Sequence, residues 1–266
     1  TGFGDSPYQC FSAFAGNPYF IDLDILCDEG LLLPEEIKAA ALGFDTGRVD
    51  YGRQYARRFP LLRRAFSRFV PGAAFAAFCA KEEKWLSPYA RFMALKTAND
   101  GAPWNAWKEK TAAPDEVRFW QFLQYHFFAQ WQAVKDYANA AGIEIIGDMP
   151  MYVAYDSADV WETPEQFLLD ERGLPLLVAG CPPDAFSADG QLWGNPIYDW
   201  AYMARQTPVF SWWGERMAHA LRLYDVVRID HFRGFASYYT VPFGEKTARR
   251  GKWCKGPGMT LFDSLR

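Results

Sequence analysis

Histidine and paired cysteines are scarce in this sequence. It has three histidines in 266 residues, and no Cys-x-x-Cys pair occurs. A zinc centre needs several closely spaced histidine, cysteine or carboxylate ligands, so we expect no metal site. The cysteines are odd in number and far apart, which argues against a disulfide framework and favours a reducing, cytoplasmic environment. They are Cys10, Cys27, Cys79, Cys181 and Cys254.

Long hydrophobic runs and a charge excess are also lacking. No apolar run approaches the roughly 20 residues that a membrane-spanning helix needs, and we expect no signal peptide. The net charge is −4, with acidic and basic residues interleaved along the sequence. We therefore expect neither a membrane nor a nucleic acid as partner.

The motifs of several large enzyme classes do not occur. There is no Gly-x-Gly-x-x-Gly, no Walker loop, no Gly-x-Ser-x-Gly and no His-Glu-x-x-His. These absences leave dinucleotide-binding, nucleotide triphosphatase, serine hydrolase and zinc protease functions without support. We expect no cofactor.

Aromatic residues, by contrast, are abundant. They make up 18% of the chain and include eleven tryptophans. Such residues can fill a core, or they can stack on sugar rings in a cleft where nearby acids and amides bind the hydroxyl groups. Composition leaves both interpretations open.

Two apolar runs each end in an acidic residue. One is the expected strand 225–230, which carries Arg228 and ends at Asp230, and the other is the expected strand 143–148, which ends at Asp148. The carboxyl ends of the parallel strands in a (β/α)₈ barrel meet at one face, and active sites form there. The sequence therefore indicates an α/β fold with two carboxylates at one barrel face.

Arg228 and Asp230 are two residues apart on the second of these strands. Side chains alternate along a strand, so both should point the same way, and the guanidinium would hold the carboxylate ionised. An ionised carboxylate at a strand end is a candidate nucleophile. A strand-end salt bridge without catalytic function would have the same pattern.

Helical patterns dominate the first half of the chain. Pro34 opens one helix, and helices follow across residues 50–99, with breaks expected at Pro60 and at Pro71-Gly72. We interpret a basic cluster in this region as a solvated helix face. The cluster consists of Arg57, Arg58, Arg63 and Arg64.

The second half alternates helices with less regular segments. The longest helix should run from Pro114 to Gly142, and another should cover residues 210–224. Residues 149–200 show no periodicity and are expected to form a long cleft loop, and residues 251–266 a loop followed by a helix start. The apolar positions expected to face the core on the two helices are Trp120, Leu123, Phe127, Trp131, Val134 and Ala138, then Trp212, Trp213, Met217 and Leu221.

Several short motifs, in this order, resemble the 4-α-glucanotransferase family, also called amylomaltases or disproportionating enzymes. Each motif alone is weak, but their order along nearly the whole chain is specific. They are Ser6-Pro7-Tyr8-Gln9, Phe14-Ala15-Gly16-Asn17-Pro18, Gly147-Asp148-Met149-Pro150, Ala154-Tyr155-Asp156-Ser157, Pro182-Pro183-Asp184, Gly190 to Pro196 and Arg228 to Gly234.

The resemblance implies part of a (β/α)₈ TIM barrel of the α-amylase superfamily, with large, mainly helical insertions. It implies transfer of α-1,4-glucan segments between maltooligosaccharides, which would be the partners. Residues 1–22 would form a barrel loop bordering the cleft, 23–113 a helical insertion subdomain, and 114–266 a barrel segment.

The resemblance also implies individual roles. Asp230 would be the nucleophile and Arg228 its supporting cation. The loop from Pro182 to Asn195 would border the acceptor side, where the family usually has an aromatic at the position of Ala185. Residues implied to bind the substrate are Tyr8, Asp148, Gln191, Trp193, Asn195 and His231.

The family's acid/base glutamate has no counterpart in this sequence. In the family it lies on a strand just past the Gly256-Pro257-Gly258 segment, beyond Arg266. We therefore expect the chain to be an internal segment of a longer enzyme and to be nearly inactive alone. An amylase-like α-glucan hydrolase and a non-catalytic glucan-binding protein remain alternatives.

Overall fold

The computed structural model describes residues 6–43 and 47–265, which form two compact units. The sheet unit contains the described residues of Thr1–Phe14, Asn99–Lys108 and Tyr137–Arg266. The helical unit contains those of Ala15–Ala98 and Glu109–Asp136. The described part of the chain has no helix long and apolar enough to cross a membrane.

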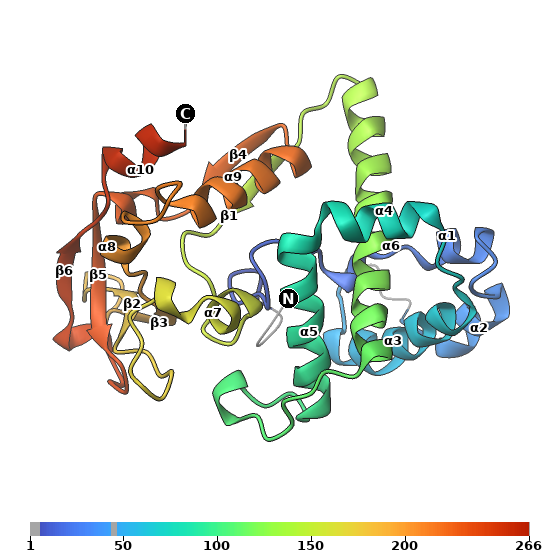
Figure 1. Cartoon of the computed structure of the whole chain (residues 1–266), viewed down its shortest axis with the longest axis horizontal. Coiled ribbons are helices and arrows are strands. Elements are labelled where there is room, and N and C mark those ends of the chain that lie inside the picture. The colour runs from blue at the N-terminus through green and yellow to red at the C-terminus, as the bar shows by residue number, and fades with distance from the viewer. Residues whose placement is uncertain (1–5, 44–46, 266) are drawn as a thin grey trace. The chain divides into compact units, whose positions relative to one another are not determined.

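The sheet unit has two sheets (Figure 1). In the first, β1 (Ile146–Met149) pairs in parallel with β4 (Val226–Ile229). The second is antiparallel, in the order β3-β2-β5-β6. Its strands are β2 (Leu177–Cys181), β3 (Gln191–Pro196), β5 (Ser237–Pro242) and β6 (Lys252–Lys255).

The parallel strands are shorter than the expected ranges 143–148 and 225–230. The side chain of Asp225 provides a reason, because its Oδ2 accepts the N–H of Ile145 at 2.8 Å and the Nδ2 of Asn139 at 2.8 Å. A side chain thus takes the hydrogen bond that a longer ladder would have used. The pairing then begins at Ile146, opposite Val226.

The prediction of a continuous loop over residues 149–200 is wrong. This region holds β2, β3, α7 (Ala158–Glu162), η4 (Pro164–Gln166) and α8 (Trp200–Met203). A Cβ on Gly180 would lie 2.3 Å from the carbonyl oxygen of Gln191, so only glycine allows β2 and β3 to approach this closely. The glycines and prolines that look like loop signals are therefore part of the sheet.

The segment expected as a loop near the C-terminus also contains a strand, β6. It pairs with β5, and one face of that strand packs into a small apolar core. The remaining short elements are η5 (Phe232–Phe235), η6 (Ala248–Arg250), α10 (Met259–Ser264) and η3 (Trp104–Ala106). The core residues on this side are Val178, Tyr239, Val241 and Ala248.

The expected helix over 210–224 is α9 (Ser211–Leu223). Trp212 and Trp213 are buried as predicted, and Trp213 packs edge-on against Phe235 with ring centroids 5.2 Å apart. Leu221 is 54% exposed, so its predicted inward position is wrong. The buried face of α9 is instead completed by polar side chains, Arg216 and His219.

The helical unit packs its helices around aromatic side chains. Phe66 meets Phe119 and Phe122 with ring centroids 5.5 Å apart in each pair. On the long helix Trp120 and Leu123 are buried, whereas Val134 is 54% exposed against expectation. The elements are η2 (Pro18–Phe20), α1 (Leu23–Asp28), α2 (Pro34–Ala40), α3 (Tyr51–Arg68), α4 (Ala73–Lys81), α5 (Glu83–Ala98) and most of α6 (Pro114–Ala140).

Pro60 lies inside α3, so the predicted helix break at this residue is wrong. An internal proline costs a helix about 3 kcal/mol. The following residues Leu61, Leu62 and Ala65 are all buried, and this packing offsets the cost. The break at Pro71-Gly72 is confirmed, since α3 ends before it and α4 begins after it.

The arginine cluster of α3 has two exposed members, Arg57 and Arg64, as the interpretation as a solvated helix face expects, and it also bonds to protein groups. Arg57 donates to the carbonyls of Ala40 and Ala41, both at 3.0 Å, where α2 ends. Arg63 makes two hydrogen bonds of 2.5 Å to the carboxylate of Glu116. These arginines tie neighbouring helices together.

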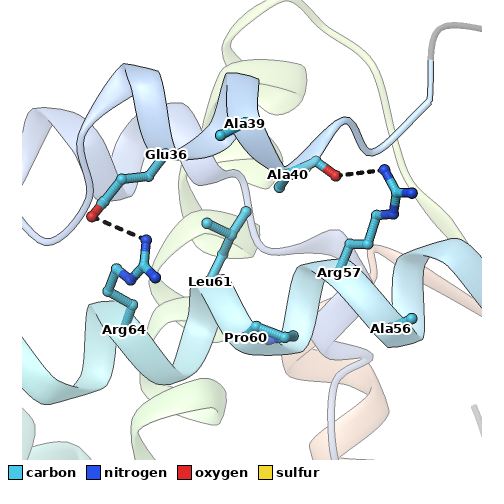
Figure 2. Close-up of a pocket in the computed structure, with 8 residues that line it drawn as sticks. All are labelled: Glu36, Ala39, Ala40, Ala56, Arg57, Pro60, Leu61 and Arg64. Carbon is cyan, nitrogen blue, oxygen red and sulfur yellow. Dashed lines mark hydrogen bonds and ion pairs between the residues drawn. The ribbon is translucent and has the colours of Figure 1, made fainter.

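A groove of about 460 Å³ runs between α2 and α3 (Figure 2). Arg57 bonds to Ala40 at one end of it, and Arg64 pairs with Glu36 at the other. The floor is formed by small and aliphatic side chains. The lining residues are Glu36, Ala39, Ala40, Ala56, Arg57, Pro60, Leu61 and Arg64.

Candidate active site

A charged cluster lies where β1 and β4 end. The strand register places Asp148 opposite Arg228, and Asp230 follows two residues later. One nitrogen of Arg228 donates to Asp148 Oδ2 at 2.6 Å, and the other donates to Asp230 Oδ1 at 2.7 Å. The guanidinium therefore bridges both predicted carboxylates, and the sequence-based expectation that Arg228 and Asp230 share a side holds.

The charges in this cluster support one another. The carboxylates of Asp148 and then Asp230 raise the pKa of Arg228 above its usual range. The side chains remain 43%, 58% and 37% exposed for Asp148, Arg228 and Asp230. The carboxylates are thus both organised by a cation and open to a ligand.

The backbone holds the two strand ends together. The N–H of Asp230 donates to the carbonyl of Met149 at 2.9 Å. A Cβ on Gly234 would lie 2.3 Å from Met151 Sδ and 2.9 Å from His231 Cδ2, so a side chain at this position would require Met151 or His231 to move. The contact between Met151 and Gly234 therefore fixes the backbone of the segments that follow Asp148 and Asp230.

His231 has a backbone φ of 51°, in the left-handed region. Its ring lies edge-on to Trp193 with centroids 4.9 Å apart. Its Nε2 is buried and has no hydrogen-bond partner among the described residues. Burial lowers the pKa of His231 even though Asp230 acts in the opposite direction, so the imidazole is neutral at neutral pH.

The wall beside His231 is built from β3 and the first described loop. Trp193 Nε1 donates to Gln191 Oε1 at 3.0 Å. Gln9 Nε2 lies 3.3 Å from both the carbonyl of Trp193 and Asn195 Oδ1. Asn195 is 5% exposed and donates to the carbonyl of Val153 at 2.8 Å. The buried amide of Asn195 therefore supports the wall by linking Gln9 to the carbonyl of Val153.

The structure brings the expected site residues into connected groups. Asp148, Arg228 and Asp230 form one group, and His231 follows directly in the chain. Tyr8 is 46% exposed and connects to the wall through its neighbour Gln9. All of them lie in the sheet unit.

Tyr152 is a wall residue that sequence reasoning missed. It is 6% exposed, and its ring centroid lies 6.2 Å from that of His231 and 6.3 Å from that of Trp193. Its buried hydroxyl has no partner among the described residues, and burial raises its pKa far above the usual range. Its position four residues after Asp148 was the available signal.

A carboxylate beside a guanidinium and a neutral histidine suits chemistry at an anomeric carbon. The carboxylate can act as a nucleophile, and the imidazole can bind a hydroxyl. Within residues 6–43 and 47–265, no group of three or more histidine, cysteine, aspartate or glutamate side chains is arranged to hold a metal ion.

Comparison with known proteins gives consistent matches. The glycoside hydrolase family 77 model, described as 4-alpha-glucanotransferase, matches residues 1–266. The chain is 49% identical over 282 residues to the 4-alpha-glucanotransferase of Clostridium butyricum. This alignment covers 100% of the chain and 58% of that protein. It is 50% identical over 285 residues to the 4-alpha-glucanotransferase of Thermus thermophilus, and this alignment covers 100% of the chain and 56% of that protein.

A solved structure agrees. The amylomaltase from Streptococcus agalactiae in complex with acarbose matches with a TM-score of 0.94 and 39% identity, over 100% of this chain and 57% of that one. This match confirms the expected α/β fold, a segment of a (β/α)₈ barrel with large helical insertions. The chain spans somewhat over half the length of the relatives it matches. It belongs to the 4-alpha-glucanotransferase family, glycoside hydrolase family 77.

Proposed function

We propose that this chain carries the nucleophile side of a 4-α-glucanotransferase, which moves α-1,4-glucan segments between maltooligosaccharides. The observation that supports this most is the single guanidinium of Arg228 bonded to both Asp148 and Asp230. The named activity of the relatives and the acarbose bound to the Streptococcus agalactiae enzyme point to the same substrate class.

In this proposal Asp230 is the nucleophile of a retaining double displacement. A carboxylate oxygen of Asp230 bonds to the anomeric carbon while the bond from that carbon to the glycosidic oxygen breaks. The departing oxygen takes a proton from a general acid. We assign that acid to no described residue, and the expectation that it lies outside residues 1–266 stays a prediction.

The second step explains transfer. A hydroxyl of an acceptor glucan attacks the anomeric carbon and displaces Asp230, while the proton returns to the acid/base group. Arg228 keeps the Asp230 oxygen in line, and Asp148 and His231 bind hydroxyls of the sugar ring that is cleaved. Gln191, Trp193 and Tyr8 would line the cleft.

We place the acceptor side at the hairpin loop between β2 and β3. The carboxylate of Asp184 accepts the N–H groups of Phe186 and Ser187, both at 2.8 Å, which orders the loop tip. Phe186 is 99% exposed and can stack on an acceptor sugar. With Ala185 before it, one ring is available at this tip where the family usually has two.

Incubating the full-length protein with maltotriose tests the proposal. We expect glucose together with a ladder of longer glucans, and loss of nearly all activity in Asp230→Asn. Hydrolysis without longer products would establish the hydrolase alternative. Tight maltoheptaose binding with no turnover would establish the binding-protein alternative, and full activity of Asp230→Asn would exclude this residue as the nucleophile. A cytoplasmic location stays a prediction.

A further inference from the structure

A guanidinium group is buried under the segment that follows Asp148. Arg216, on α9, is only 3% exposed. It donates to the carbonyl of Met151 at 3.1 Å and also to the carbonyl of Pro150. A buried cation is costly unless it is bonded. These two carbonyls accept from the terminal nitrogens of Arg216, while its buried Nε has no hydrogen-bond partner among the described residues.

The indole rings of α9 hold this guanidinium in position. Its central carbon lies 5.3 Å from the ring centroid of Trp212 and 5.1 Å from that of Trp213. Both rings are buried. Since the planar fork of arginine is fixed by these rings, its two hydrogen bonds impose a defined position on the Pro150–Met151 backbone.

Met151 connects that backbone to the turn that follows Asp230 and contains His231 and Gly234. Its carbonyl also accepts the hydroxyl of Tyr198 at 2.9 Å. Its side chain fills the space at Gly234, where a Cβ would lie 2.3 Å from Sδ. A shift of Met151 would therefore move the turn that carries His231.

Arg216 also acts on a second buried group. Asp159 is 7% exposed, and burial raises the pKa of its carboxyl to about 6, against which the N–H of Ala13 and the positive charge of Arg216 both act. Asp159 accepts the N–H of Ala13 at 2.8 Å, and the neighbouring N–H of Ala158 donates to the carbonyl of Phe11 at 2.8 Å. This anchors the loop that carries Tyr8 and Gln9.

We propose that Arg216 is a positioning residue of the glucanotransferase site, which fixes the segments that follow Asp148 and Asp230 from beneath. It is too deeply buried to touch a glucan, and it acts through the Pro150–Met151 backbone and through Asp159. The proposal rests on the proposed function for its catalytic consequence, whereas the anchoring of the Pro150–Met151 segment can be measured without substrate.

The test compares Arg216→Met and Arg216→Lys with Arg205→Met in the full-length protein. Methionine keeps the apolar contact with the indoles but removes both hydrogen bonds, and lysine restores the charge without the fork. Arg205 is exposed and serves as the matched control for loss of an arginine charge. Assays are run on maltotriose well below the unfolding temperature of each variant.

We expect Arg216→Met to lower kcat by roughly 10² with little change in KM, because a displacement of about 1 Å at a reacting group costs about this much. Arg216→Lys should recover part of the rate, and Arg205→Met should keep the wild-type rate. Hydrogen exchange should accelerate in peptides covering 149–153 and 230–234. The reporter amide is that of Asp230, which is bonded to Met149.

Other results would overturn the proposal. A kcat within twofold of wild type in Arg216→Met would do so, and so would faster exchange throughout the chain, α3 of the helical unit included, since that indicates general destabilisation. If the wild type lacks transferase activity, the proposed function fails, and local exchange alone decides whether Arg216 anchors the segment.

Discussion

Replacing Gly147 by alanine would test the parallel strand pair most directly. Gly147 lies between Ile146 and Asp148 on β1, opposite Val227 of β4. A methyl group at this position would lie 2.1 Å from Cδ2 and 2.3 Å from Cγ of the Tyr224 ring. The ring therefore occupies the space that any side chain at residue 147 would need.

The expected losses of stability and of kcat in Gly147→Ala follow from that overlap. Carbon atoms in contact lie about 3.5–4.0 Å apart, so either the ring of Tyr224 or the strand must move by roughly 1.5 Å. Overpacking of this kind costs about 1–3 kcal/mol, and each kcal/mol lowers Tm by about 2–4 °C in a domain of 150–250 residues. If the strand moves, Asp148 moves with it, and kcat on maltotriose should fall by roughly 10².

The assay is thermal unfolding together with maltotriose kinetics of full-length Gly147→Ala. Gly214→Ala on α9 is the matched control, because its nearest atom would be Leu265 Cδ2 at 3.9 Å. This control should be neutral or more stable by about 0.5–1 kcal/mol. Adding Tyr224→Ala to Gly147→Ala should restore part of the lost stability. Equal Tm values for Gly147→Ala and Gly214→Ala would refute the reasoning.

Two further predictions concern charged groups. Arg228→Lys should lower kcat/KM by about 10², because a point charge cannot reproduce the two bonds to Asp148 and Asp230; a loss below threefold would contradict this. Burial lowers the pKa of His126 to about 4, although the Glu29 carboxylate lies 3.3 Å from Nδ1. An unfolded histidine has a pKa of about 6.5, so the unfolded state binds more protons between these values and stability is lost as pH falls through this window. His126→Phe should flatten Tm between pH 4 and 6.5, and an unchanged slope would show that another group titrates there.

The charged cluster of the site could be predicted because it depends on local rules. An apolar run that ends in an acid located both parallel strands, and side-chain alternation put Arg228 and Asp230 on one side. The link from Arg228 to Asp148 needed only the further assumption of parallel pairing. The same local logic failed at the strand starts, where the side chain of Asp225 replaces a ladder bond.

The antiparallel sheet could not be predicted because its pairings are distant and its strands carry turn residues. Gly180 of β2 pairs with Leu192 and with Tyr239, and neither contact leaves a periodic trace in sequence. The prediction of a helix break at Pro60 failed for a different reason, since the burial of neighbouring side chains outweighs the cost of the lost hydrogen bond. Tertiary packing overrode local propensity in both regions.

The bridge made by Arg228 also makes activity a measure of strand registration. Asp148 and Arg228 are 80 residues apart in sequence and meet only when β1 and β4 pair in their observed register. A slip of one residue would turn Arg228 to the opposite face and leave both carboxylates without their shared cation. Molecules with a misaligned pair would be inactive even if compact, so specific activity would report the fraction of molecules that completed this pairing.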